Sequence, residues 1–110
     1  MDYFMTNNII SVLTSDIVNS SKMKTEDVEN LVGKQIPALI SKMSSIAYNY
    51  SSYRGDSTQV TILDPTKAIY VATLLRIYVI ACTNYDERYT NKYDIRTSIG
   101  IGTRETDNNG

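Results

Sequence analysis

The sequence predicts an α+β fold, in which helices cover one face of an antiparallel β-sheet. Two long segments carry apolar residues at helical spacing, and segments rich in β-branched and aromatic residues precede, separate and follow them. Two of these β-prone segments meet at Gly55-Asp56, a strong signal for a β-hairpin. The predicted order is strand, helix, strand, strand, helix, strand, which is the ferredoxin-like order βαββαβ.

Size and composition limit the classes of function. The chain has 110 residues, enough for one hydrophobic core, and we expect a single domain over 1–110. Its formal net charge is −1 and it has no basic cluster, so we expect neither nucleic acid nor a membrane surface as a partner. Cys82 is the only cysteine, which excludes a disulfide within the chain and favours a reducing, cytoplasmic location. The absence of histidine excludes His-based catalysis and His-rich zinc sites.

The first strand is expected over 8–14, after a short leader at 1–7. This segment is β-branched and nearly continuously apolar, as a buried central strand would be. Small polar residues follow at 15–21. They predict a loop whose backbone N–H groups can point at an anion.

The first helix is predicted to begin with Thr25 as N-cap. Glu26 and Asp27 fall in its first turn, where the helix dipole favours acidic side chains. Pro37 lies within the helical segment and has no backbone N–H, so we expect a kink or a division of the helix there. The apolar residues recur on one side, as in a helix packed on a sheet: Val28, Leu31, Val32, Leu39, Ile40, Met43, Ile46 and Ala47.

The hairpin is expected to join strands at 48–54 and 58–63. Gly55 tolerates the positive φ that such a turn requires. After the hairpin, Asp64 and Pro65 suit the N-cap and the first position of a second helix. The predicted buried residues of this helix are Ala68, Ile69, Ala72, Leu75, Tyr78, Val79 and Cys82.

The last strand is expected over 94–103. Its isoleucines alternate imperfectly with smaller residues, and Gly100 and Gly102 leave room for a backbone or a ligand to come close. Polar residues predict a loop at 84–93 and a tail at 104–110.

Two aspartates are expected to meet at one end of the sheet. In the ferredoxin-like arrangement the first strand and the second hairpin strand are central neighbours. Asp16 and Asp56 would therefore come together, and we predict that their carboxylates lie within roughly 8 Å of each other. Two carboxylates at this distance favour a hard divalent cation, Mg²⁺ or Mn²⁺, and the loop at 19–21 offers N–H groups to phosphates. Two-metal phosphoryl chemistry uses a clamp of this kind.

Three segments together resemble the catalytic domain of class III nucleotidyl cyclases. The segment Ser15-Asp16-Ile17-Val18-Asn19-Ser20-Ser21 is similar to the opening "DIVxST" motif of that domain. Arg54-Gly55-Asp56-Ser57 is similar to its "GD" hairpin, and Ser98-Ile99-Gly100-Ile101-Gly102 to its later "IGI" strand. A group of bacterial cyclase-like proteins, including SatD-like proteins, has still closer versions of these motifs.

The resemblance implies a set of site residues. Asp16 and Asp56 would be the two metal-binding aspartates, and the backbone carbonyl of Ile17 a further ligand. The amides around Asn19 and Ser20 would hold the phosphates of a nucleoside triphosphate. The resemblance also implies a homodimer, because cyclase-like domains build their site between two protomers. We expect the sheet face without helices to carry apolar or tyrosine side chains for this contact.

The chain departs from the family in two ways. The family's domain continues beyond its "IGI" strand with a purine-selecting residue and with the Asn and Arg that stabilise the transition state. We therefore expect a domain that is truncated at its C-terminus and is not a competent cyclase by itself. The purine-selecting position before the hairpin falls at or near Ser52, which favours neither base.

Other interpretations stay open. Asp16 and Asp56 are also common turn-forming residues, which would leave a non-enzymatic ferredoxin-like module for dimerisation or regulation. A relative of polymerase palms or diguanylate cyclases would share the fold, but the hairpin lacks the second acid of that group. Gly100-x-Gly102 is no dinucleotide fingerprint, because the third glycine and the following helix are missing. The sequence leaves open whether the full-length protein is an enzyme.

Overall fold

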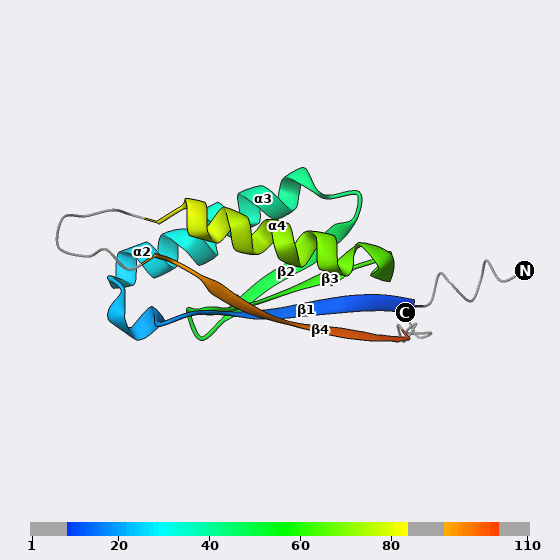
Figure 1. Cartoon of the computed structure of the whole chain (residues 1–110), viewed down its shortest axis with the longest axis horizontal. Coiled ribbons are helices and arrows are strands. Elements are labelled where there is room, and N and C mark those ends of the chain that lie inside the picture. The colour runs from blue at the N-terminus through cyan, green and yellow to red at the C-terminus, as the bar shows by residue number, and fades with distance from the viewer. Residues whose placement is uncertain (1–8, 84–91, 104–110) are drawn as a thin grey trace, which may run out of the picture.

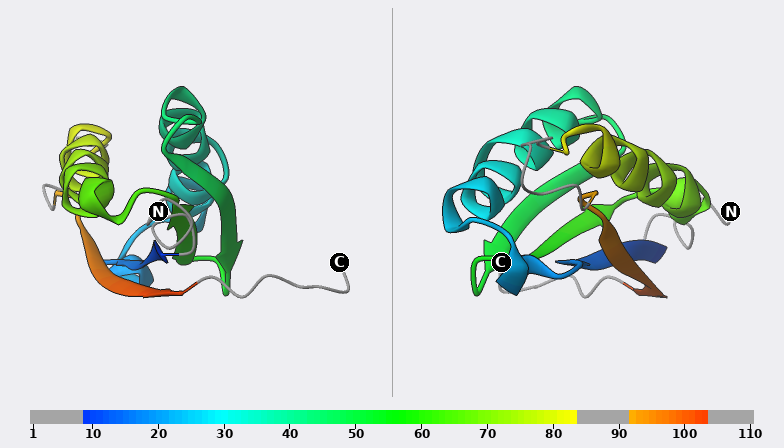
Figure 2. Two further views of the ribbon diagram at one scale, coloured as in Figure 1. Left: turned by 90° about the vertical axis from the view of Figure 1, so that its right-hand side faces the viewer. Right: turned by 60° about the vertical axis from the view of Figure 1, so that its left-hand side comes forward.

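The fold is an antiparallel four-stranded sheet with helices on one face. The computed structural model describes residues 9–83 and 92–103, and its strands lie in the order β2-β3-β1-β4 (Figure 1). The helical segments at 25–42 and 68–81 lie on the same side of the sheet (Figure 2). The predicted α+β, ferredoxin-like architecture is confirmed. The strands are β1 Ile9–Ile17, β2 Ala47–Tyr53, β3 Ser57–Ile62 and β4 Ile95–Thr103. The predicted leader at 1–7, most of the loop at 84–93 and the tail at 104–110 lie outside the described residues.

The core lies between the sheet and its helical layer. Leu13 and Ile62 come from the two central strands, and Ile36 and Leu75 come from the helices; each is at most 1% exposed. Burial of such apolar side chains is the main favourable term in folding. The core therefore fixes which face of each strand points toward the helices.

Strand β1 is longer than predicted, because it ends at Ile17 and not at Thr14. Its polar residues find partners on both neighbouring strands. The Ser15 and Thr97 hydroxyls are hydrogen-bonded to each other at 2.9 Å, which allows Ser15 to be buried. The Val18 N–H donates to the backbone oxygen of Asp94 at 3.0 Å and extends the ladder of β1 and β4 past the end of β1. Asp16 thus lies within the strand and not in the predicted loop.

The first helical segment is divided, as Pro37 predicts. It consists of α2 (Thr25–Asn30), a π-helical turn η2 (Leu31–Gln35) and α3 (Ile36–Lys42). The Ile36 N–H donates to the Leu31 oxygen, and this wider turn leads directly into the proline at the start of α3. The predicted N-cap is displaced by one residue, because Lys24 takes that position and Thr25 is already helical.

The second helical segment begins as predicted, but its buried side differs at two positions, Ile69 and Val71. The N-H and hydroxyl of Thr66 both donate to Asp64, which caps the short helix η3 (Pro65–Lys67). The following helix α4 (Ala68–Ala81) buries Val71. Ile69, predicted to be buried, is 72% exposed, because the face toward the sheet runs through Ala68, Val71, Leu75 and Val79. None of the helices in the described part of the chain is long and apolar enough to cross a membrane.

The hairpin turn has three residues and begins one residue earlier than the predicted strand bounds imply. Tyr53 and Ser57 are paired, and Arg54, Gly55 and Asp56 connect them. Positive φ values fall on Arg54 (58°) and Gly55 (80°). The glycine therefore serves the turn as predicted, while the reversal begins one residue earlier.

The uncovered face of the sheet is mixed in character. Tyr48 and Tyr53 are exposed on it, and Val12 is half-buried, in partial agreement with the predicted apolar and tyrosine patch. Toward the end of β1, however, its residues are polar: Thr14, Asp16, Ser57, Gln59, Arg96 and Ser98. This polar end includes Asp16, one of the predicted site residues.

Tyr50 provides a test of the contact between β2 and the first helical segment. Its hydroxyl donates to the Val32 backbone oxygen at 2.7 Å, and burial raises its pKa to about 12. We expect Tyr50→Phe to cost about 1 kcal/mol of unfolding free energy at neutral pH. Above pH 10 the unfolded state loses its Tyr50 proton first, so the wild type should lose stability as pH rises toward 12. Urea unfolding of both proteins over this range should show the gap closing; a constant gap would contradict this account.

Candidate functional site

The C-terminal end of β1 lies beside the tip of the β2–β3 hairpin. Asp16 pairs with Ser57 in the antiparallel ladder of β1 and β3. The Ile17 N–H donates to the backbone oxygen of Asp56 at 3.1 Å. Because Asp56 immediately precedes Ser57, the first residue of β3, the two aspartates lie at the same end of the sheet, Asp16 on β1 and Asp56 in the hairpin turn. The predicted meeting of strand end and hairpin tip follows from this register, and the distance between the two carboxylates stays a prediction.

A serine hydroxyl holds each of these carboxylates. Ser57 Oγ donates to Asp16 Oδ1 at 2.7 Å, and Ser20 Oγ donates to Asp56 Oδ2 at 2.7 Å. Hydrogen bonds to an ionised acceptor are stronger than neutral ones and fix its orientation. Sequence reasoning missed both contacts, although each serine lies next to or within a motif that it had identified.

The donor set is compatible with a hard divalent cation. Among the hydrogen bonds of the described residues, Asp16 and Asp56 each use one side-chain oxygen, which leaves the other available. Mg²⁺ and Mn²⁺ prefer oxygen ligands, and the Ile17 carbonyl is of the same class. Over 9–83 and 92–103 no three acidic, cysteine or histidine side chains form a metal-binding group. Water and phosphate oxygens would have to supply the remaining ligands.

The loop after β1 forms a cavity with the hairpin tip. Asn19 adopts a left-handed conformation (φ 55°, ψ 34°), which turns the chain into the short helix η1 (Ser20–Lys22). A cavity of about 290 Å³ lies between η1, α2 and the tip, and Ser20, Ser21 and Asp56 line it. Asn19 is not among the lining residues. The cavity therefore brings together three of the predicted site residues.

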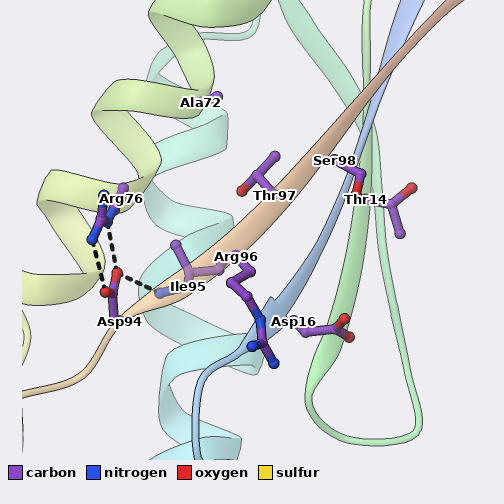
Figure 3. Close-up of a pocket in the computed structure, with 9 residues that line it drawn as sticks. All are labelled: Thr14, Asp16, Ala72, Arg76, Asp94, Ile95, Arg96, Thr97 and Ser98. Atoms are coloured by element: carbon purple, nitrogen blue, oxygen red, sulfur yellow. Dashed lines mark hydrogen bonds and ion pairs between the residues drawn. The ribbon is translucent and has the colours of Figure 1, made fainter.

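Asp16 lines a second cavity, of about 610 Å³, which extends along β4 (Figure 3). Arg96 is its direct cross-strand neighbour on β4 and lines the same cavity. Since β1 lies between β4 and β3, Arg96 does not separate Asp16 from Asp56. The local sequence does not identify Arg96 as a site residue. Only the pairing of β1 with β4, which local sequence does not contain, places this cation beside Asp16.

An ion pair fixes the start of β4 against α4. Arg76 donates to both carboxylate oxygens of Asp94, at 2.8 and 3.0 Å (Figure 3). These hydrogen bonds hold the pKa of Asp94 below its ordinary value. Asp94 Oδ1 also accepts from the Ile95 N–H at 2.8 Å. The pair positions the first residues of β4 and, with them, Arg96.

Comparison with solved structures identifies the fold. No protein-family model and no curated protein sequence matches the chain. The monomeric guanylyl cyclase domain of the RhoGC fusion protein from the aquatic fungus Blastocladiella emersonii is similar, with a TM-score of 0.65 and 17% identity over 87% of this chain and 61% of that chain. The guanylyl cyclase Cya2 is similar with a TM-score of 0.63 and 16% identity, over 86% of this chain and 54% of that chain. A third similar structure is the catalytic core of a rhodopsin-guanylyl cyclase with converted specificity, in complex with ATPαS. Its TM-score is 0.60 and its identity 21%, over 87% of this chain and 58% of that chain.

These similarities extend over most of this chain but over less than two thirds of each solved structure. At identities of 16% to 21%, these structural similarities show the fold and do not show the chemistry of the site. The chain has the fold of the class III nucleotidyl cyclase catalytic domain.

Proposed function

We propose that the chain is a nucleotide- and divalent-metal-binding domain of the nucleotidyl cyclase type. The observation that supports this most directly is the register of β1 and β3, which brings Asp16 to the residue next to Asp56. Both aspartates lie in motifs that resemble those of cyclases. Asp16 lies at the polar end of the uncovered sheet face, and Asp56 lines the cavity beside Ser20 and Ser21, so a charged ligand would meet hydroxyl groups at both places.

Each residue has a separate part in this proposal. The carboxylates of Asp16 and Asp56 and the carbonyl of Ile17 would hold Mg²⁺ or Mn²⁺, which lowers the pKa of a bound hydroxyl and neutralises phosphate charge. Ser20 and Ser57 orient the two carboxylates through their hydroxyl groups. Backbone amides at 19–21 would receive the phosphates. Arg96, beside Asp16, adds a cation at the edge of the same surface.

The proposal is tested by calorimetric titration with non-hydrolysable ATP and GTP analogues, with and without Mn²⁺. We expect binding only in the presence of the metal. Adenine and guanine analogues should bind with similar affinity, because the residue at the purine-selecting position, Ser52, favours neither base. A lack of binding under all these conditions would instead support the non-enzymatic ferredoxin-like module.

That module is the second candidate function, and one observation favours it. The Ser20–Asp56 hydrogen bond ties the loop after β1 to the hairpin tip, which is a structural use for the aspartate that needs no ligand. If this is its whole role, loss of the carboxylate changes stability and leaves nucleotide affinity unaffected.

We expect this polypeptide to form no cyclic nucleotide from ATP or GTP in the presence of Mn²⁺. By the resemblance, the Asn and Arg that stabilise the transition state follow the last strand in the family's domain. Loss of one such donor typically costs ~10²–10³ in rate, and loss of both should cost more. Mass spectrometry of the reaction mixture measures the product. Cyclic product that disappears in both Asp16→Ala and Asp56→Ala would contradict this expectation while supporting the site.

The proposal also includes self-association and a cytoplasmic location. A second copy of the chain is the expected protein partner, by the resemblance to domains that build their site between protomers. The single cysteine, Cys82, continues to favour a reducing compartment. Nucleic acid and membrane surfaces are not expected as partners, because the formal net charge is −1.

A further inference from the structure

Arg54 carries a charge that the fold itself does not use. It lies in the turn of the β2–β3 hairpin and lines the cavity between η1, α2 and the hairpin tip. Its side chain is exposed. Over residues 9–83 and 92–103, no hydrogen bond or ion pair engages its guanidinium group. The guanidinium is therefore available to a ligand in the cavity.

The backbone conformation of Arg54 is unfavourable for an arginine. Its φ is 58°, in the left-handed region where a Cβ atom crowds the backbone. The other described non-glycine residues with positive φ are both asparagines, Asn19 and Asn49. Asparagine adopts this region more readily than most residues that have a Cβ. An arginine in the turn thus costs free energy, which indicates that its side chain has a use outside the turn.

The charged groups of the cavity favour an anion only when a metal is present. Its charged lining residues are Glu29, Arg54 and Asp56. Two carboxylates and one guanidinium give a net charge of −1, to which a divalent cation held by Asp56 would add two positive charges. Hydroxyl groups of Ser21 and Thr25 also line the cavity. Hydroxyl and guanidinium groups donate hydrogen bonds, and phosphate oxygens accept them.

The size of the cavity suits part of a nucleotide. Its volume of about 290 Å³ is at the lower end of the range for small-molecule pockets, about 300–1,000 Å³. It is large enough for phosphate groups and too small for an entire nucleoside triphosphate. The nucleoside would therefore lie outside this cavity, which agrees with a site that a second protomer completes. The phosphates inside it would be the terminal ones.

We propose that Arg54 binds the terminal phosphates of the nucleotide in this cavity. The planar guanidinium presents its N–H groups as a fork that matches phosphate oxygens. Asp56 lines the same cavity, so the metal that it would hold and the Arg54 guanidinium would contact one phosphate chain. Because this role rests on the proposed function, it adds a side chain to the backbone amides at 19–21 as a group that receives phosphates.

Calorimetric titration with Mn²⁺ tests this role with two probes, a non-hydrolysable ATP analogue and inorganic tripolyphosphate. Arg54→Asn should weaken the binding of both at least ~10-fold, because each loses charge-assisted hydrogen bonds. Lys42→Asn makes the same change in net charge in the last turn of α3 and should leave both affinities within about twofold. A loss for the ATP analogue alone would mean that Arg54 contacts the nucleoside, and would overturn the proposal.

Glu29→Gln tests whether Arg54 acts instead through an ion pair across the cavity. Removal of this carboxylate takes away a charge of the same sign as phosphate. Tripolyphosphate should therefore bind this variant at least as tightly as the wild type. A loss of affinity equal to that of Arg54→Asn would show that Arg54 acts through Glu29, and would overturn the proposal.

Thermal unfolding without ligand separates binding from a structural role. Arg54→Asn should raise the unfolding temperature by a few degrees, because asparagine tolerates positive φ better than arginine. Weaker binding together with a lower unfolding temperature would mean that Arg54 serves the fold, and would overturn the proposal.

The wild type distinguishes failure of this inference from failure of the proposed function. A wild type that binds neither probe with Mn²⁺ overturns the proposed function and this role with it. A wild type that binds both probes, with an Arg54→Asn variant that binds them equally well, overturns the role of Arg54 alone.

Discussion

Replacement of Asp56 by Asn should weaken Mn²⁺-dependent nucleotide binding at least roughly 100-fold, since loss of even an outer-shell partner of a metal site typically costs 10–100-fold. The amide keeps the shape of the carboxylate and can still accept the hydrogen bond from Ser20 Oγ. It removes the negative charge that a divalent cation requires. Asp16→Asn should have an effect of similar size. Calorimetric titration with a nucleotide analogue measures the change.

A matched control separates this effect from a general loss of negative charge. Asp27→Asn makes the same change in net charge in the first turn of α2, outside the site, and should leave the affinity within about twofold. Ser20→Ala and Ser57→Ala should give intermediate losses of roughly 10-fold, because each removes a hydrogen bond that orients one aspartate. Full affinity in Asp56→Asn would show that this residue only forms the turn, and would favour the regulatory module.

The element order could be predicted from the sequence because its signals are local. Helical periodicity, Asp64-Pro65 and the glycine in the hairpin each act within a few residues of their own position. The end of β1 could not be predicted in this way. Ser15 looks like a loop residue, but it is buried in a strand because its hydroxyl partner, Thr97, lies 82 residues away.

The candidate site was predictable to the same limited extent. The motifs identified Asp16 and Asp56, and the predicted topology brought their segments together. Strand register determines every cross-strand neighbour, and the two strands that pair with β1 lie far from it in the sequence. For this reason Arg96 beside Asp16, and Ser57 as the residue that holds it, became apparent only in the structure.

The same limit applies to the two apolar residues at the centre of β1. From the sequence, Val12 and Leu13 are equivalent members of one apolar run. In the structure Leu13 points into the core and is fully buried, whereas Val12 points to the uncovered face and is half-buried. Their contributions to the free energy of unfolding should therefore differ.

Leu13→Ala should lower the free energy of unfolding by about 2–5 kcal/mol, because it removes buried methyl groups and leaves a cavity under the helices. Val12→Ala should lower the free energy of unfolding by only about 1 kcal/mol, because the Val12 side chain is only half-buried. Urea unfolding at low protein concentration measures both. Equal losses at low concentration would contradict a sheet with one bare face. A loss for Val12→Ala that grows as protein concentration rises would show that two copies of the chain associate through the uncovered face.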